Sequence, residues 1–130
     1  MKQSLAKILL FLAVVFLVDQ PRAEAAETIS PKKLAQMLQE GEQLQLLDVR
    51  ELSEIQRAGF PGARHIPMGQ LEARIAELNP DQTTVVICHY GNRSSVAAEQ
   101  LKKKGFKNVM NLKGGIDAYS REVDPGIPRY

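Results

Sequence analysis

From about residue 30 onward, the chain alternates short apolar runs with segments whose apolar residues recur at helical spacing. The two strongest runs are residues 44–49 (LQLLDV) and 84–87 (TVVI), and the second is the richest in β-branched side chains. Such runs are typical of strands buried in a sheet. Residues 109–112 predict another strand, and residues 63–67 predict a short extended segment.

Helical segments lie between these runs. Ser30 followed by Pro31 is typical of a helix start, because Ser caps free N–H groups and Pro fits the first turn. Gly41 is expected to end this helix. Further helical segments are predicted at residues 51–58, 71–79, 94–104 and 116–121. Strands separated by helices predict an α/β fold, a small parallel β-sheet flanked by helices on both faces.

The first 25 residues have a different pattern. Lys2 and Lys7 precede the apolar run of residues 8–18, which is shorter than the about 20 residues that a membrane-spanning helix needs. Ala23 and Ala25 then supply small residues at a cleavage site. We therefore expect residues 1–25 to be a cleaved secretory signal peptide that directs the protein to a bacterial periplasm. An uncleaved membrane anchor is the alternative.

The remaining residues, 26–130, have the length of a single domain. Lys and Arg number 17 and Asp and Glu 15, a net charge of +2. No basic run is interleaved with aromatic residues, so a nucleic-acid partner is not expected. No membrane contact is expected after signal cleavage. The sequence leaves the oligomeric state open.

Cys88 is the only cysteine of the chain. Exported proteins commonly use cysteines in disulfides, and a single cysteine cannot form one internally. Three uses remain: a buried inert thiol, half of an intermolecular disulfide, or a thiol kept for chemistry.

The position of Cys88 favours chemistry. It follows the predicted strand 84–87 and precedes a predicted helix, where ligands bind in parallel sheets. Gly91 and Asn92 tolerate left-handed backbone angles, so the loop can turn its N–H groups inward. Such a nest at a helix N-terminus binds anions and stabilises a thiolate, and Arg93 adds positive charge. We therefore predict that Cys88 is a thiolate nucleophile, with a packed thiol as the alternative.

Four motifs carry a family resemblance. Residues 88–94 (CHYGNRS) resemble the active-site loop of single-domain rhodaneses, in which Cys is followed by Gly and then by Arg-Ser at a helix start. Residues 48–50 (DVR), 61–67 (PGARHIP) and 111–115 (NLKGG) resemble further rhodanese motifs in the same order. The resemblance extends from about residue 30 to residue 119.

The resemblance implies a sulfurtransferase without a cofactor. Cys88 would take the outer sulfur of thiosulfate or a similar small-molecule donor and pass it, as a persulfide, to cyanide or a thiol acceptor. Backbone N–H groups of the loop would hold the anionic persulfide, and Arg93 would help bind the donor. The residues implied to bind substrate are His89, Tyr90, Gly91, Asn92, Arg93 and Ser94.

Other polar residues are expected to have supporting roles. The side chain of His89 is expected to point away from the nucleophile beside it. His65 and His89 with a single cysteine make no metal site. Asp48, Arg50 and Glu54 are expected to form an ion-pair network that braces the end of the sheet near the loop.

Two other functions could use a similar site. A Cys-based phosphatase or arsenate reductase also places a thiolate in an anion cradle, but phosphatases that resemble this fold have one more residue between Cys and Arg than the four found here. A non-catalytic module that carries or binds sulfur for a partner protein stays open, since a sequence does not show turnover.

Overall fold

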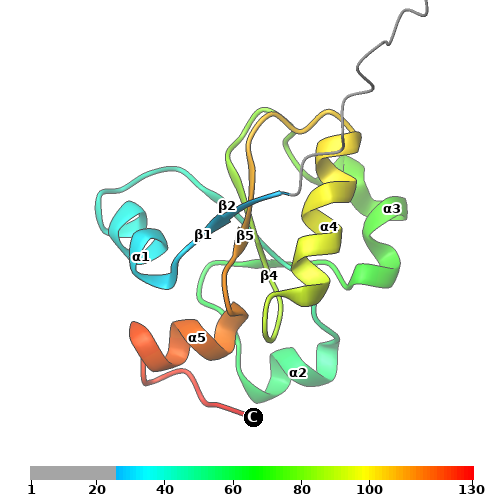
Figure 1. Ribbon diagram of the computed structural model, residues 1–130. Coiled ribbons are helices and arrows are strands. Elements are labelled where there is room, and N and C mark those ends of the chain that lie inside the picture. Colours follow the sequence, from blue (N-terminus) through cyan, green and yellow to red (C-terminus); the bar gives the residue numbers. More distant parts are fainter. Residues whose placement is uncertain (1–25) are drawn as a thin grey trace, which may run out of the picture.

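The computed structural model describes residues 26–130, and the predicted signal peptide lies outside this range. A five-stranded sheet with strand order β1-β5-β4-β2-β3 forms its centre, and every neighbouring pair is parallel (Figure 1). The strands are β1 (Glu27–Ile29), β2 (Gln45–Asp48), β3 (Arg64–His65), β4 (Thr84–Ile87) and β5 (Val109–Leu112). The predicted α/β class is confirmed.

Four α-helices lie between successive strands, and a fifth follows β5. They are α1 (Pro31–Gln39), α2 (Leu52–Arg57), α3 (Leu71–Arg74), α4 (Asn92–Lys103) and α5 (Gly115–Glu122). The predicted cap of α1 is confirmed, because the Ser30 hydroxyl accepts a hydrogen bond of 3.1 Å from the Lys33 N–H. Among the helices of residues 26–130, none is long and apolar enough to cross a membrane.

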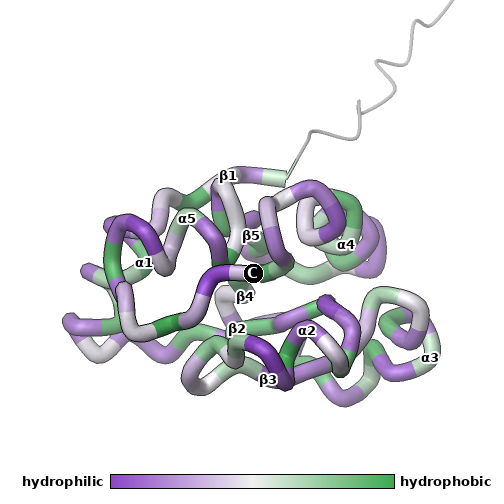
Figure 2. Tube along the Cα trace, turned by 90° about the horizontal axis from the view of Figure 1, so that it is seen from below, coloured by the Kyte–Doolittle hydropathy of each residue, from purple (hydrophilic) through white to green (hydrophobic). Residues whose placement is uncertain are grey.

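Alternate side chains of the strands point to opposite faces of the sheet, and a separate hydrophobic core covers each face. Val86 and Cys88 belong to the core on the side of α3 and α4. Val85 and Ile87 belong to the core on the side of α1 and α5. Figure 2 shows the layers, with the strands between α1 and α5 on one side and α3 and α4 on the other. The helices therefore flank both faces, as predicted.

Three elements differ from the prediction. β1 was not expected, because its three residues expose all but Ile29 and give no apolar run. The segment predicted as one helix from residue 71 is a single α-helical turn, α3, between the 3-10 turns Met68–Gln70 and Ile75–Glu77. α4 begins two residues earlier than predicted, at Asn92, because the preceding turn is completed at Gly91.

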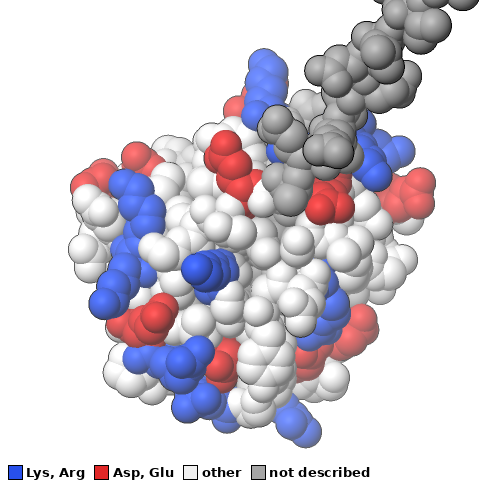
Figure 3. Space-filling view, viewed as in Figure 1, with Lys and Arg blue, Asp and Glu red and all other residues white. Residues whose placement is uncertain are grey.

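Charged side chains are mixed by sign on the face shown in Figure 3, where Lys and Arg lie among Asp and Glu. This distribution agrees with the small net charge of the chain.

Candidate active site

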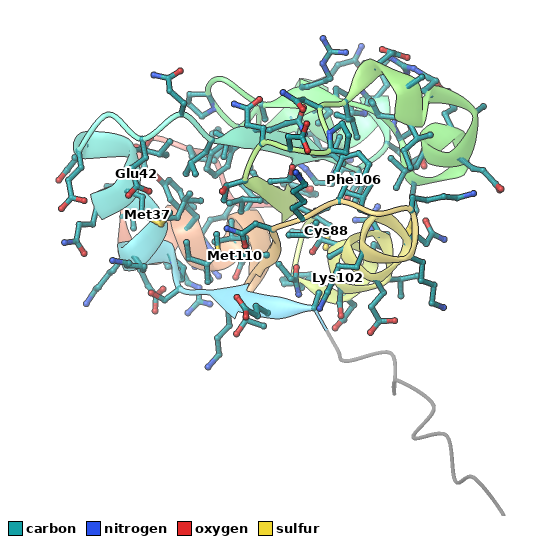
Figure 4. The ribbon with its side chains drawn as sticks, turned by 90° about the horizontal axis from the view of Figure 1, so that it is seen from above. Met37, Glu42, Cys88, Lys102, Phe106 and Met110 are labelled. Atoms are coloured by element: carbon teal, nitrogen blue, oxygen red, sulfur yellow. The ribbon has the colours of Figure 1, made fainter. Side chains whose placement is uncertain are left out.

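Cys88 follows β4 directly and lies in the interior, near the centre of the view in Figure 4. β4 pairs with β2 on one side and β5 on the other, so Cys88 lies at the carboxyl end of an inner strand. It is 1% exposed. Burial alone would suit a packed thiol, so the groups that face the sulfur decide between the two alternatives.

Polar groups from the start of α4 surround the sulfur. The Gly91 N–H donates to Cys88 Sγ at 3.1 Å, and the Ser94 N–H donates at 3.3 Å. The Ser94 hydroxyl oxygen lies 3.1 Å from the same sulfur. Two N–H donors at a helix N-terminus favour a negatively charged sulfur, which a merely packed thiol does not need.

Two of the predicted loop donors contact the sulfur itself, and we call the groups of Gly91 and Ser94 around Sγ the cradle. Within the described chain, no backbone N–H of His89, Tyr90, Asn92 or Arg93 donates to Sγ, and their roles toward a substrate stay predictions. Gly91 has the left-handed angle expected of it, with φ +100°. Asn92, which also tolerates such an angle, instead belongs to the right-handed helix α4.

Asn111, on β5, fixes the orientation of this cradle. Its amide nitrogen donates to the Gly91 carbonyl at 3.0 Å, so its oxygen faces Ser94 and accepts the Ser94 hydroxyl proton. The Ser94 oxygen is then left as an acceptor toward Cys88 in its thiol form. Asn111 lies within the NLKGG motif, but sequence reasoning assigned it no role.

The start of α5 holds the other side of the loop. The Ile116 N–H donates to the Cys88 carbonyl at 2.9 Å, and the Asp117 N–H donates to the His89 carbonyl at 3.1 Å. Gly115 lies so close that a Cβ atom there would collide with both carbonyl oxygens. The double glycine predicted as a turn therefore also lets α5 reach the cysteine loop.

Arg93, in the first turn of α4, is paired with Glu54 of α2. Its Nη1 and Nη2 each donate to one carboxylate oxygen at 2.7 Å. The hydrogen bond from Arg93 is the main cause that lowers the pKa of Glu54 to about 2, and the same bond raises the pKa of Arg93. Both groups are therefore charged near neutral pH, and the guanidinium charge beside the cradle is compensated.

The expected network of Asp48, Arg50 and Glu54 is present in part. Arg50 is fully buried and pairs with Asp48, with 2.7 Å between Arg50 Nη2 and Asp48 Oδ2. Burial opposes its charge, but the hydrogen bonds that Arg50 donates to Asp48 and Tyr130 prevail and raise the pKa of Arg50. Glu54 is joined to this pair through the Tyr130 hydroxyl rather than directly. No sequence signal marked Tyr130.

His89 is held by aromatic stacking. Its ring centroid lies 3.8 Å from that of Tyr90 and 3.9 Å from that of Tyr130, and both pairs are nearly parallel. One imidazole face has room for one ring at this distance, so the two tyrosines lie on opposite faces. The ring of His65 instead contacts the Arg50 carbonyl. Across residues 26–130, no three His, Cys, Asp or Glu side chains gather closely enough to hold a metal ion.

Comparisons with known proteins agree on one family. The model of the rhodanese-like domain family matches residues 30–122. The chain is 43% identical over 102 residues to the putative sulfur carrier protein YrkF of Bacillus subtilis, covering 78% of this chain and 55% of that protein. It is 35% identical over 100 residues to a sulfurtransferase of Allochromatium vinosum, covering 77% of this chain and 91% of that protein.

Other matches extend the comparison. A chloroplastic rhodanese-like/PpiC domain-containing protein of Arabidopsis thaliana is 44% identical over 93 residues, 68% of this chain and 31% of that protein. The chain therefore spans only about half or less of the length of this protein and of YrkF. The crystal structure of a rhodanese-like domain protein from Staphylococcus aureus matches with a TM-score of 0.70 and 27% identity, over 80% of this chain and 98% of that one.

Proposed function

Because the chain belongs to the rhodanese-like domain family, we propose that it moves a sulfane sulfur from thiosulfate or a similar donor, through a persulfide on Cys88, to cyanide or a thiol. The observation that carries the proposal is the pair of N–H groups, from Gly91 and Ser94, directed at the sulfur of the only cysteine. A sulfurtransferase among its relatives supports the same chemistry.

The first half-reaction loads the cysteine. The Cys88 thiolate attacks the outer sulfur of thiosulfate, a new S–S bond forms, and the donor's S–S bond breaks. Sulfite leaves with the electron pair, and the negative charge moves to the outer sulfur of the persulfide. The N–H donors of Gly91 and Ser94 stabilise the attacking thiolate, and the positive end of α4 favours negative charge throughout the step.

The second half-reaction unloads it. The cyanide carbon attacks the outer sulfur, thiocyanate leaves, and the electron pair of the broken S–S bond returns to Cys88 as a thiolate. A thiol acceptor in its thiolate form reacts in the same way and becomes a persulfide itself. No external oxidant or reductant is needed, which fits a site built from one cysteine and no second thiol.

A non-catalytic sulfur carrier is the second candidate. The similarity to a putative sulfur carrier protein favours it, although this chain covers only 55% of that protein. The loading step on Cys88 would be the same. The two functions differ in whether small acceptors remove the sulfur at a useful rate.

Intact-mass spectrometry distinguishes a sulfurtransferase from a non-catalytic sulfur carrier. Mature protein mixed with thiosulfate and no acceptor is expected to gain one sulfur atom, and added cyanide should return the original mass and release thiocyanate. Cys88→Ser should show neither event, because a hydroxyl is not ionised near neutral pH. A wild type that gains no sulfur from any donor would overturn the proposal. Loading without removal by any acceptor would favour the carrier.

Export to the periplasm remains a proposal of its own. It is supported by the short apolar run at residues 8–18 and the Ala-Glu-Ala sequence that ends at Ala25. N-terminal sequencing of protein recovered from a periplasmic fraction should begin at Ala26. Protein that keeps Met1 in a membrane fraction would contradict cleavage.

A further inference from the structure

Tyr130 lies in the segment that follows α5, beyond the residues 30–122 that match the family. We propose that Tyr130 is a positioning residue of the active site, which holds Glu54, and through it Arg93, in place beside Cys88. The inference rests on the proposed sulfur transfer. It assigns to Tyr130 a part in donor binding.

The segment before Tyr130 is fixed on α5. Ile127 is 5% exposed and belongs to the core on that side of the sheet. Its carbonyl accepts a hydrogen bond from the Ser120 hydroxyl, and Arg129 pairs with Asp117 at 3.1 Å. In Figure 1 the C-terminal end accordingly lies beside α5 and α2, at the end of the molecule where β4 passes into α4. Tyr130 is thus brought to the site by several independent contacts.

The Tyr130 hydroxyl connects two ion pairs. Arg50 Nη1 donates to it at 2.8 Å, and it lies 3.1 Å from Glu54 Oε1. Since a guanidinium only donates and a carboxylate only accepts, the hydroxyl proton must point to Glu54. The buried Asp48–Arg50 pair thereby orients the hydroxyl, and the hydroxyl orients the carboxylate that binds Arg93.

The Tyr130 ring supports the cysteine loop at a second point. It stacks on His89, the residue after the nucleophile, at 3.9 Å between centroids. The guanidinium carbons of Arg50 and Arg57 lie 5.8 and 6.0 Å from its ring centroid, within the range of cation–π attraction. Ring and hydroxyl therefore act on different parts of the cradle, and separate substitutions can distinguish them.

Glu54 Oε1 accepts from both Tyr130 and Arg93 Nη2. Without the Tyr130 hydroxyl, the Glu54 carboxylate could rotate more freely, and the guanidinium of Arg93 that is bound to it would move as well. Arg93 precedes Ser94, whose N–H and hydroxyl contact the sulfur. The loss should therefore be felt when the donor anion binds, separately from the stability lost because Arg50 Nη1 has no other hydrogen-bond partner.

Three variants test this. Tyr130→Phe removes the hydroxyl and keeps the ring, and Tyr130→Leu removes both. Tyr119→Phe is the matched control, because Tyr119 packs on Phe60 in the same core and its hydroxyl makes no hydrogen bond within residues 26–130. Steady-state kinetics with thiosulfate and cyanide, the unfolding temperature and intact-mass loading are measured for each.

For Tyr130→Phe we expect a KM for thiosulfate roughly three- to tenfold higher and kcat within about twofold. The unfolding temperature should also fall, because the buried Arg50 Nη1 loses its hydrogen-bond partner. Tyr130→Leu should raise KM further, and Tyr119→Phe should match the wild type. In an Arg93→Ala background, Tyr130→Phe should add nothing, because its effect passes through Arg93.

An active wild type with an unchanged KM in Tyr130→Phe would overturn the inference. An equal effect of Tyr130→Phe with and without Arg93 would also overturn it, since this would mean packing alone. A wild type that gains no sulfur would instead overturn the proposed function on which the inference rests.

Discussion

Arg93 and Glu54 form an ion pair with two parallel hydrogen bonds, each 2.7 Å long, between the first turn of α4 and helix α2. The ion pair holds Arg93 in place next to Ser94, whose N–H contacts the sulfur. An approaching donor anion therefore meets a guanidinium whose charge is already compensated by the Glu54 carboxylate. The kinetic role predicted for Arg93 must therefore be tested together with Glu54.

Arg93→Ala is expected to raise the KM for thiosulfate about tenfold to hundredfold. The reason is the loss of charge-assisted hydrogen bonds to a doubly charged donor, typically worth roughly 1.5–3 kcal/mol. Steady-state kinetics of the purified variant measure the change. Unchanged KM and kcat would mean that the backbone N–H groups bind the donor without Arg93.

The double variant Arg93→Ala with Glu54→Gln is the control. Arg93→Ala alone leaves the Glu54 carboxylate unpaired near the cradle, where it repels an anion. If Arg93 binds the donor, KM stays high in the double variant. If Arg93 only neutralises Glu54, KM returns close to the wild-type value.

The stability of the protein should fall in acid partly because of Glu54. Its pKa is about 2 in the folded chain, against an ordinary value of 4.5, chiefly through the hydrogen bond from Arg93. A lowered pKa stabilises the fold above about pH 4.5, and this contribution disappears as the pH falls toward about 2. Urea unfolding of wild type and Glu54→Gln should therefore differ most above about pH 4.5 and converge below it. A difference that stays constant across this range would contradict the assignment.

The central strands and the placement of Cys88 were predictable because their signals are local. The run of residues 84–87 gave β4 with its observed bounds, and the residues after it gave Cys88 at a strand end before a helix. Periodicity and turn residues act within a few positions, so they are visible in one sequence.

The partners of the site were harder to predict because they are distant along the chain. Asn111, Tyr130 and the pairing of Arg93 with Glu54 each join segments that only the folded sheet brings together. Tyr130 lies in a turn-rich tail without hydrophobic periodicity, so the sequence pattern does not predict where this residue lies in the fold. The short β1 was missed for a related reason, since its pairing with β5 supplies what its own three residues do not indicate.

Gly115→Ala should destabilise the protein and impair activity. Gly115 has φ +64°, and its Cβ would collide with the carbonyl oxygens of His89 and Cys88. Gly41→Ala is the matched control, because Gly41 has φ +77° with nothing within 4 Å of a Cβ. Left-handed strain of roughly 1–2 kcal/mol applies to both, so urea unfolding should show the larger loss for Gly115→Ala. Only Gly115→Ala should also lower kcat. Equal losses would show that α5 does not constrain the cysteine loop.

Asn111 offers a test of the cradle that separates its geometry from its charge. The side chain is 6% exposed, donates to the Gly91 carbonyl and accepts from the Ser94 hydroxyl. Asn111→Leu removes one hydrogen bond from each of these groups, which keep the Ser95 N–H and Cys88 Sγ as partners. Each lost bond is typically worth about 0.5–1.5 kcal/mol, so the unfolding temperature should fall. Asn111→Leu adds no charge, so it should raise the KM for thiosulfate less than Asn111→Asp does.

Asn111→Asp keeps the shape and the acceptor toward Ser94, but it cannot donate to Gly91 and places a negative charge behind the cradle. Because the bound donor and the persulfide are both anions, we expect this variant to raise the KM for thiosulfate at least about tenfold. Steady-state kinetics of the two variants, compared at equal folded fraction, measure the difference. A wild-type KM in Asn111→Asp would show that a charge on β5 does not reach the sulfur site.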